Sequence, residues 1–370
     1  MLKGFRFCII LLMLMACGFF YRKTSKQPST IFKSIISPGS KSPSSSSTYP
    51  ATNVSFSPIS SMDVLKKGNA TNVSFSPINS MDVLRKGNGI IFVETTDRMK
   101  PPSLVLCAIE SAARVYKDRS VVFFMKGLPD INTMEDEFKA RNHFPTLSSF
   151  DNVYFFPLQM EKLFNDTPLM PWYKKVNPKF ERYWTHVSSD GCRLALIWRH
   201  GGIYMDSDII SMRPIPDVNF LAAQSSQYSS NGIFGLINHH IFSWKSMESF
   251  VQNYKGAIWG HQGPQLFTRI LNQFCVIPQF KSTEDVKCGN ISFLHPQRFY
   301  PIPYPAWRRY YDVWQNVQTF NDSYALHLWN FMNQEQKSMV PGSNTLIEHL
   351  YKQYCPTTYG ALERNQPIYG

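Results

Sequence analysis

Short apolar runs alternate along this chain with longer amphipathic stretches. Residues 89–94, 120–126 and 153–157 consist mainly of β-branched, aliphatic and aromatic residues, which predicts three buried strands. Residues 101–116 repeat apolar side chains at helical spacing, after a Pro-Pro pair that suits the first turn of a helix. This alternation predicts an α/β sheet with flanking helices, whose ligands bind beyond the carboxyl ends of the strands.

The N-terminal part does not follow this pattern. Residues 7–21 form an unbroken apolar run with basic residues on both sides. As a helix this run spans about 22 Å, so it reaches across a bilayer only if the flanking charges snorkel. Three interpretations compete: an uncleaved signal-anchor, a signal peptide cleaved at a poor small-residue site around residues 16–18, and a lipoprotein-type signal at residues 14–17.

Residues 22–88 are rich in Ser, Pro, Thr and Lys and predict a disordered stem. The stem contains a tandem duplication of 19 residues, in which Ala51–Asn69 and Ala70–Asn88 differ at only two positions. Two copies are too few for a solenoid, which needs about three. We therefore interpret the duplication as a spacer rather than a binding repeat, and expect deletion of Ala70–Asn88 to leave activity unchanged.

The net charge of +12 is unevenly distributed. Residues 1–88 hold eleven basic and two acidic residues, giving +9, whereas residues 89–370 hold 27 and 24, giving +3. A nucleic-acid-binding protein would concentrate its positive charge on the folded domain. The distribution therefore argues against a nucleic-acid partner and favours basic residues near a membrane.

Glycosylation sequons and cysteines point to an oxidising compartment. The N-x-S/T sequons are at Asn53, Asn69, Asn72, Asn165, Asn290 and Asn321. Their position after the apolar N-terminus supports a luminal domain at 89–370. The cysteines beyond the N-terminus show no zinc-type spacing, so we expect disulfides rather than a metal cluster. Cys275–Cys288, which closes a short loop, is the favoured pair. Cys107–Cys355 would then be the second and leave Cys192 as a buried thiol, and the sequence leaves the connectivity open.

The most informative segment is GGIYMDSDII, at Gly201–Ile210. If Asp206 and Asp208 lie in an extended strand, their side chains share one face at the strand's end. Two such carboxylates suit a hard divalent cation that takes further oxygens from water and from a substrate phosphate. A lone D-x-D is weak evidence, however, because solvated loops often contain one.

The residues that precede this segment strengthen the interpretation of Asp206 and Asp208 as a cation site. Ser188 or Ser189 is predicted to cap a helix that ends at the Gly-Gly pair. Asp190 and Arg193 are three residues apart and share one helix face. They could form an ordinary surface ion pair. The alternative is that they bind the sugar and ribose hydroxyls of a nucleotide sugar.

The pattern S-D-x-x-R, a short apolar helix and G-G-x-Y-x-D-x-D resembles the sugar-binding region of D-x-D glycosyltransferases with a GT-A fold. Further segments are similar to the alpha-1,4-glycosyltransferase family: Phe92–Thr96, Val121–Gly127, Ser229–Gly235, Trp259–Pro264 and Tyr324–Asn330. The resemblance covers roughly residues 89–360. It implies a GT-A-like nucleotide-sugar-binding sheet.

The resemblance also implies roles for individual residues. Asp206 and Asp208 are expected to be catalytic and to hold Mn²⁺ or Mg²⁺. The residues expected to bind the UDP-sugar donor are Asp190, Arg193, Tyr204, Glu94, Thr95 and His327. A core position for His327 and a plain turn for Glu94 and Thr95 remain equally open. Asn231 and Trp329 are expected to bind the acceptor, and the aromatic residues beyond Tyr254 are expected to be mainly core.

The resemblance implies a retaining transferase with an oxocarbenium-like transition state. Three segments, Ser188–Ile210, Phe220–Gly235 and Ser292–Trp314, are similar to the family branch that transfers N-acetylglucosamine. This predicts transfer from UDP-N-acetylglucosamine to terminal β-galactose of O-glycans in alpha-1,4 linkage. The alternatives are the branch that transfers galactose from UDP-galactose to lactosylceramide, and an inactive membrane-tethered glycan-binding protein.

The family also implies a location in the Golgi membrane. On this basis residues 1–6 are expected to be a cytosolic tail, residues 7–21 a type II signal-anchor, residues 22–88 the stem and residues 89–370 the luminal catalytic domain. The sequence says nothing about the oligomeric state.

Overall fold

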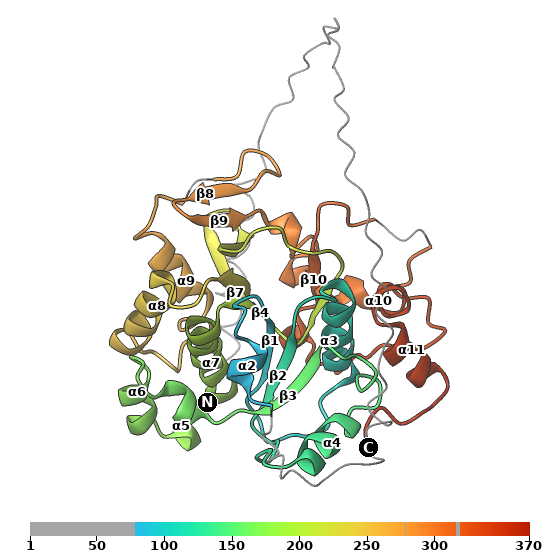
Figure 1. Cartoon of the computed structure of the whole chain (residues 1–370). Helices are drawn as coiled ribbons and strands as arrows, with labels where there is room; N and C mark the ends of the chain where they lie inside the picture. Colours follow the sequence, from blue (N-terminus) through green and yellow to red (C-terminus); the bar gives the residue numbers. More distant parts are fainter. Residues whose placement is uncertain (1–77, 278, 316–318) are drawn as a thin grey trace, which may run out of the picture. The chain divides into compact units, whose positions relative to one another are not determined.

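The computed structural model describes residues 78–277, 279–315 and 319–370, which fold around a mixed eight-stranded sheet (Figure 1). In sheet order the strands are β3 (Val153–Pro157), β2 (Val121–Met125), β1 (Ile90–Glu94), β4 (Gly202–Met205), β7 (Tyr228–Leu236), β6 (Phe220–Ser225), β9 (Ile291–Leu294) and β8 (Val286–Cys288). A separate two-stranded ribbon pairs β5 (Ile209–Ser211) with β10 (Ala325–His327).

The α-helices are α2 (Ser80–Val83), α3 (Ser103–Val115), α4 (Met134–Asn142), α5 (Met160–Phe164), α6 (Met170–Lys175), α7 (Trp184–His200), α8 (Ile241–Gln252), α9 (Pro264–Leu271), α10 (Leu346–Tyr354) and α11 (Pro356–Glu363). Short 3₁₀ helices are η1 (Pro178–Phe180), η2 (Pro296–Arg298), η3 (Tyr304–Tyr311) and η4 (Asn330–Met332).

The three predicted strands are confirmed as β1, β2 and β3, and the predicted helix between the first two is α3. These strands pair in parallel, and β1 and β2 are buried along their whole length. A parallel strand covered on both faces needs a continuous apolar sequence rather than an alternating one. This explains why the apolar runs alone located these elements.

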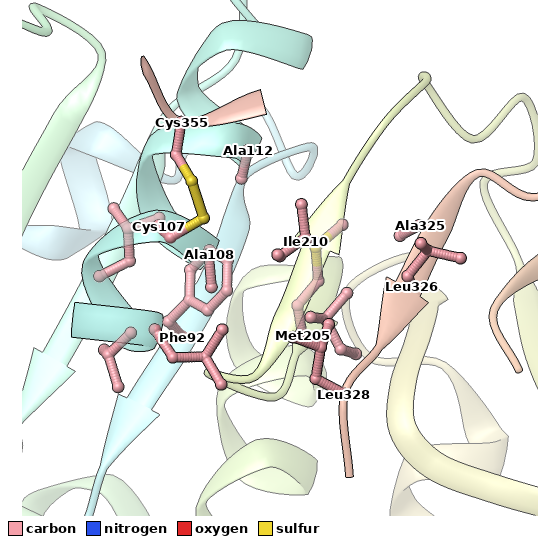
Figure 2. Close-up of a cluster of buried hydrophobic side chains, with 14 of the residues drawn as sticks. Phe92, Cys107, Ala108, Ala112, Met205, Ile210, Ala325, Leu326, Leu328 and Cys355 are labelled. Atoms are coloured by element: carbon pink, nitrogen blue, oxygen red, sulfur yellow. A yellow bond between two sulfur atoms is a disulfide. The ribbon is translucent and has the colours of Figure 1, made fainter. Parts of the chain in front are cut away.

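Successive residues of β1 face two different cores. Ile90 and Phe92 belong to the cluster that contains α3, α10 and α11 residues, whereas Ile91 and Val93 belong to the cluster of α7, α8 and α9. Figure 2 shows the first cluster, in which Phe92 packs below α3 and the Cys107–Cys355 disulfide crosses to the segment that precedes α11. The sheet is therefore the middle layer of an α/β fold.

Both predicted disulfides are present, and Cys192 is a buried free thiol, as predicted. Cys107–Cys355 joins α3 to residues near the C-terminus, 248 positions away in the sequence. Cys275–Cys288 joins the segment after α9 to β8.

Strand β4 connects the parallel part of the sheet to the rest. It pairs in parallel with β1 and antiparallel with β7. Gly202 has φ +96°, and a Cβ there would lie 2.3 Å from the Gly89 carbonyl oxygen, so this entry into β4 requires glycine. The carboxyl end of β4, where the acidic pair follows, lies at the same edge of the sheet as the carboxyl end of β1.

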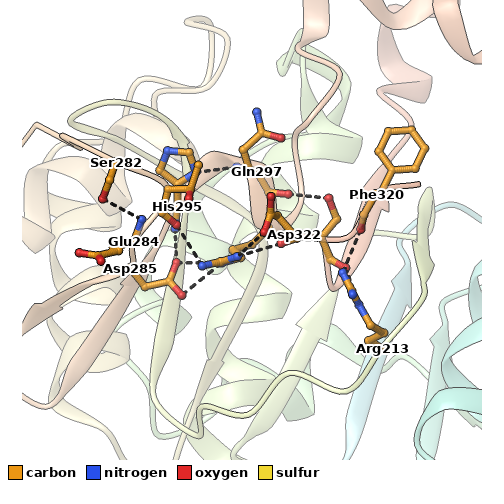
Figure 3. Close-up of polar contacts among 11 residues, drawn as sticks. Arg213, Ser282, Glu284, Asp285, His295, Gln297, Phe320 and Asp322 are labelled. Atoms are coloured by element: carbon orange, nitrogen blue, oxygen red, sulfur yellow. Dashed lines mark hydrogen bonds and ion pairs between the residues drawn. The ribbon is translucent and has the colours of Figure 1, made fainter. Parts of the chain in front are cut away.

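A polar network holds the chain that leads into β10 (Figure 3). The Arg298 side chain donates to Asp285 Oδ1 at 3.1 Å and to the Asp322 carbonyl oxygen at 3.1 Å. Arg213, just after β5, donates to the Phe320 carbonyl oxygen at 2.9 Å. These bonds fix the start of β10 relative to β5.

Two local predictions need correction. The helix predicted to start at Ser188 or Ser189 begins at Trp184, so both serines lie inside α7. The Ser188 hydroxyl donates to the Thr185 carbonyl oxygen at 3.2 Å, a local bond that serine also makes within helices. The stretch around Asn231, which was expected to bind the acceptor, is the largely buried strand β7.

The folded part also begins earlier than predicted. The Asn79 side chain caps α2 by accepting a hydrogen bond from the Asp82 N–H, and Leu84 is only 2% exposed within the core on the α7 side. The second copy of the duplication therefore ends inside the fold, not in the stem. Residues 1–77, with the predicted anchor, lie outside the described residues. Within residues 78–277, 279–315 and 319–370, no helix is long and apolar enough to cross a membrane.

This burial revises the expected result of the deletion. Removing Ala70–Asn88 joins the first copy to Gly89, so Leu65 replaces Leu84 and only two side chains change. We expect this deletion to lower the free energy of unfolding by no more than about 1 kcal/mol, the range of one exchanged cap residue. Leu84→Ala in the intact chain should cost about 2–5 kcal/mol in urea unfolding. Leu65→Ala is the matched control, and an equal loss there would contradict the assignment.

Candidate active site

Asp206 and Asp208 lie in a tight turn between β4 and β5, at the carboxyl edge of the sheet. The Asp206 N–H donates to the Gly232 carbonyl oxygen at 2.7 Å, and the Asp206 carbonyl oxygen accepts from Ile209 at 3.1 Å. The predicted extended strand is therefore wrong at these two residues, because β4 ends at Met205. The turn still brings the two carboxylates close together, as the D-x-D spacing predicts.

The β5–β10 ribbon adds a third side chain. His327 pairs with Ile209, and the Leu328 N–H donates to the Asp208 carbonyl oxygen at 3.0 Å. His327 Nε2 lies 3.1 Å from Asp208 Oδ1 and 3.9 Å from Asp206 Oδ2. The interpretation of His327 as an ordinary core histidine is thus incomplete. The residue is buried, but its Nε2 faces the acidic pair.

These three side chains form a donor set that suits a divalent cation. One ligand atom from each of Asp206, Asp208 and His327 lies within 4.8 Å of the other two. Carboxylate oxygens suit Mg²⁺ and Mn²⁺, and imidazole is accepted by the transition metals. The other Asp208 oxygen, Oδ2, accepts the Asn330 N–H at 2.7 Å, which fixes the carboxylate. The residues therefore fit the cation predicted from the sequence.

Arg193 holds Asp206 from the helix side. Its Nη1 lies 2.9 Å from Asp206 Oδ1, which also accepts the Tyr204 hydroxyl at 2.7 Å. The guanidinium group lies over the Tyr204 ring at 4.4 Å and is almost fully buried. Since Oδ1 already has two donors, Oδ2 is the Asp206 oxygen that faces His327.

Asp190 extends this network. Its Oδ1 lies 3.6 Å from Arg193 Nη2 and accepts the Asn231 side-chain amide at 2.6 Å. Burial raises the pKa of Asp190 to about 6, against the opposing effects of Arg193 and Asn231. Of the two interpretations of this pair, the ordinary surface ion pair does not hold, because both side chains are largely buried at the edge of the acidic cluster.

The two central carboxylates differ in their environments. Burial raises the pKa of Asp206, and the neighbouring Asp208 charge adds to this effect while Arg193 opposes it. Burial would also raise the pKa of Asp208, but His327 and the Asn330 N–H outweigh it and hold that pKa below its usual range. Asp208 is therefore the more firmly ionised carboxylate.

Two predicted acceptor residues occupy supporting positions instead. Asn231 is 5% exposed. Its side-chain amide donates to Asp190, and its backbone carbonyl oxygen accepts from Arg193. Trp329 is 8% exposed, donates from Nε1 to the Ile302 carbonyl oxygen at 2.7 Å and packs edge-on against His327. Neither position fits the acceptor contact predicted for it, because both side chains are buried and already bonded.

Glu94 and Thr95 follow β1 at the expected edge of the sheet, but their side chains are engaged. Glu94 Oε1 accepts the N–H and hydroxyl of Thr96, and Oε2 pairs with Arg98 at 2.5 Å. The Thr95 hydroxyl donates to the Thr185 carbonyl oxygen at 3.0 Å. Thr95 thus contacts the start of α7. The polar side-chain groups of Glu94 and Thr95 are all bonded within the protein, so these contacts do not decide between donor binding and a plain turn.

Comparison with known proteins identifies the family. Residues 102–228 match the model of the glycosyltransferase sugar-binding region containing the DXD motif, and residues 236–362 match the alpha-1,4-glycosyltransferase conserved region. Human alpha-1,4-N-acetylglucosaminyltransferase is 58% identical over 271 residues, which cover 73% of this chain and 79% of that protein. The chain belongs to the alpha-1,4-glycosyltransferase family.

A mouse relative of the family, lactosylceramide 4-alpha-galactosyltransferase, is 38% identical over 279 residues, covering 74% of this chain and 76% of that protein. Among solved structures, the galactosyltransferase LgtC, in complex with donor and acceptor sugar analogues, matches with a TM-score of 0.38 at 12% identity, covering 74% of this chain and 96% of that one. The two transferase relatives and the family model make the chain a hexosyltransferase of this family.

The alpha-1,4-glycosyltransferase site contains residues that the sequence did not single out. The Ser230 hydroxyl accepts from the Tyr300 hydroxyl at 2.7 Å and from the Gly232 N–H at 3.0 Å. Asn330 contributes its backbone N–H to Asp208. Backbone donors leave no side-chain signal, and the Tyr300–Ser230 contact joins residues 70 positions apart, so no local pattern could reveal them.

Gly232 lets Asp206 approach β7 closely. A Cβ at this position would lie 2.8 Å from Asp206 Oδ2, the oxygen that faces His327. We expect Gly232→Ala to lower the transfer rate about 10²-fold, since a displacement of about 1 Å at a reacting centre has that effect. Far-ultraviolet circular dichroism should stay unchanged. The control is Gly191→Ala on α7, where a Cβ meets only ordinary contacts; equal rates for both variants would contradict the prediction.

The sequons of the described part are compatible with glycosylation. Asn165, Asn290 and Asn321 are all exposed. The other predicted sequons, Asn53, Asn69 and Asn72, lie outside the described residues.

Proposed function

We propose that this enzyme transfers N-acetylglucosamine from UDP-N-acetylglucosamine to terminal β-galactose of O-glycans, forming an alpha-1,4 linkage with retention. The observation that carries the proposal is the identity of 58% to an alpha-1,4-N-acetylglucosaminyltransferase, against 38% to the galactose-transferring relative, over nearly the same length. The acidic site supports the chemistry that both branches of the family share. The difference in identity favours the branch that transfers N-acetylglucosamine.

In this proposal Asp206, Asp208 and His327 would hold Mn²⁺ or Mg²⁺. A divalent cation supplies Lewis-acid stabilisation of the leaving nucleotide. The Asn330 N–H bonds Asp208 Oδ2, the oxygen that does not face His327, and would keep this carboxylate oriented and ionised when His327 binds the cation. Asp206 is kept in place by Tyr204 and Arg193. All of these groups are positioned before substrate arrives, which is how electrostatic catalysis avoids a reorganisation cost.

Asp190 and Arg193 are proposed to contact donor hydroxyls. Asp190 is a carboxylate acceptor on the edge of the cluster, and Asn231 fixes its orientation from behind. Below about pH 6 Asp190 would be protonated and would lose its capacity as a double acceptor. Asn231 thus keeps a place in the site as a positioning residue, which contacts Asp190 rather than a sugar.

The proposed location is the Golgi membrane, with residues 7–21 as a type II signal-anchor and the catalytic part in the lumen. The support is the apolar run with its flanking basic residues, together with the sequons and the two disulfides. Disulfides of this kind persist in the secretory pathway and not in the cytosol.

A donor competition tests the proposal. The full-length protein in detergent is incubated with Mn²⁺ and equal concentrations of UDP-N-acetylglucosamine and UDP-galactose. The acceptor is methyl β-galactoside in one reaction and lactosylceramide in another, and each product is digested with linkage-specific glycosidases. We expect N-acetylglucosamine in alpha-1,4 linkage as the main product. Preference for UDP-galactose with lactosylceramide would assign the sibling activity. Binding without transfer would favour the glycan-binding alternative.

A further inference from the structure

Two stacked aromatic rings stand exposed beside the acidic site. Trp259, in the loop between α8 and α9, and Phe331, in η4, stack with ring centroids 3.8 Å apart and an interplanar angle of 11°. They are 43% and 42% exposed. All eight tryptophans of the chain lie in the described residues, and Trp259 is the only exposed one. Exposure of paired large rings is typical of ligand contact, since core aromatics are buried.

The stack is tied to the site from two sides. Phe331 directly follows Asn330, whose N–H donates to Asp208 Oδ2 at 2.7 Å. His186 packs edge-on against both rings, at 4.7 Å from Trp259 and 4.8 Å from Phe331. His186 lies on α7 one turn before Asp190, and so on the same helix face. The rings therefore lie next to the residues assigned to cation and donor.

The loop that carries Trp259 is itself anchored. The Gln262 side chain is buried, donates to the Phe250 carbonyl oxygen at 2.7 Å and accepts from the Lys255 N–H at 3.2 Å. Gly263 packs directly against the Asn231 amide, so closely that a Cβ would lie 2.9 Å from it. Trp259 thus has a fixed position relative to the Asn231–Asp190 contact.

The surface of the stack is apolar and uncharged. In the part of the chain that the structure describes, no Lys or Arg lies over either ring. Burial lowers the pKa of His186 to about 4, so its imidazole is neutral. The adjacent Ile258 and Met332 are also exposed. Such a surface offers nothing to a diphosphate, whereas it suits the C–H face of a neutral sugar ring.

We propose that the Trp259–Phe331 stack is the acceptor platform, on which the terminal β-galactose lies. This inference rests on the proposed function and adds the acceptor subsite to it. Galactose carries its C3, C4 and C5 hydrogens towards one face, which can lie flat on an aromatic ring. A galactose on this platform lies beside the donor groups on α7, where its 4-hydroxyl can meet the donor sugar.

The test is a comparison of Michaelis constants in the full-length enzyme. Trp259→Ala and Phe331→Ala should each raise KM for methyl β-galactoside about tenfold, or about 1.4 kcal/mol, with KM for UDP-N-acetylglucosamine changed less than about twofold. Trp259→Phe should recover most of the loss. The control is Phe180→Ala, which removes an 85% exposed ring on η1. A rise in the donor KM instead would show that the rings hold the uracil base and would overturn the proposal.

Direct binding separates this inference from the proposed function. Methyl β-galactoside is titrated into the protein with UDP and Mn²⁺ present, and binding is followed by tryptophan fluorescence and by ligand-observed NMR. Binding that is lost in Phe331→Ala and Trp259→Ala supports the platform even if no sugar donor gives transfer. If the unmodified protein does not bind the galactoside, or both variants bind it equally well, the platform is wrong.

Discussion

Asp208→Asn is expected to lower sugar transfer by about 10³-fold, the upper range for loss of one preorganised electrostatic group in an active site. Asp208 has one oxygen 3.1 Å from His327 Nε2 and the other bonded to the Asn330 N–H. Asparagine keeps the shape of the side chain but removes the charge that faces a cation. The measurement is the initial transfer rate at saturating Mn²⁺ and UDP-sugar.

The control for Asp208→Asn is Asp217→Asn, a carboxylate that bonds Ser292 and Lys287 in the β6–β9 region. This change should leave the rate within about twofold, since a partly exposed ion pair contributes little. Thermal melting should show both variants folded. An Asp208→Asn enzyme with a near-normal rate in Mn²⁺ would remove Asp208 from the mechanism.

Arg193→Met should cost both activity and stability. The buried guanidinium compensates two buried carboxylates, at 2.9 Å from Asp206 and 3.6 Å from Asp190. Removing one partner of a buried ion pair costs about 3–5 kcal/mol, because the remaining charges stay buried without compensation. We expect a loss of this size in the free energy of unfolding, measured in urea, and no measurable transfer.

Arg199→Met provides the comparison on the same helix. Arg199 donates to the carbonyl oxygens of Leu163 and Asn165 and has no carboxylate partner among the residues that the structure describes, so its loss should cost about 1 kcal/mol. The double variant Asp190→Asn, Arg193→Met should recover part of the stability, since it removes one of the uncompensated charges. Equal stability of Arg193→Met and Arg199→Met would contradict the proposed electrostatic role.

The sequence predicted what depends on local patterns. Continuous apolar runs located β1, β2 and β3, because these strands are covered on both faces. The spacing of Asp190 and Arg193 placed them on one face of a helix, and the structure joins them. The Cys275–Cys288 pair closes a short loop, which made it the easiest disulfide to predict.

The errors arise where tertiary contacts decide. The orientation of His327 towards Asp208 follows from pairing of β10 with β5, more than a hundred residues earlier in the chain. Asn231 and Trp329 carry the right chemistry for sugar contact, but the strand and the ring cluster around them bury both side chains. Leu84 belongs to a duplicated, polar segment that has no strong periodicity, so its place in the core could not be recognised. The sequence grouped Trp259 with the aromatic residues beyond Tyr254 that were expected to be mainly core, and only its exposure distinguishes it from buried members of that group such as Trp307.

The most direct test of the proposed cation site is calorimetric titration of UDP into the full-length protein, once with Mn²⁺ and once with EDTA. If Asp206, Asp208 and His327 form a cation site that receives the donor diphosphate, UDP should bind at least about tenfold more tightly with Mn²⁺, a difference of about 1.4 kcal/mol, and should lose this gain in Asp208→Asn. Equal UDP affinity in Mn²⁺ and in EDTA would contradict the assignment of the site.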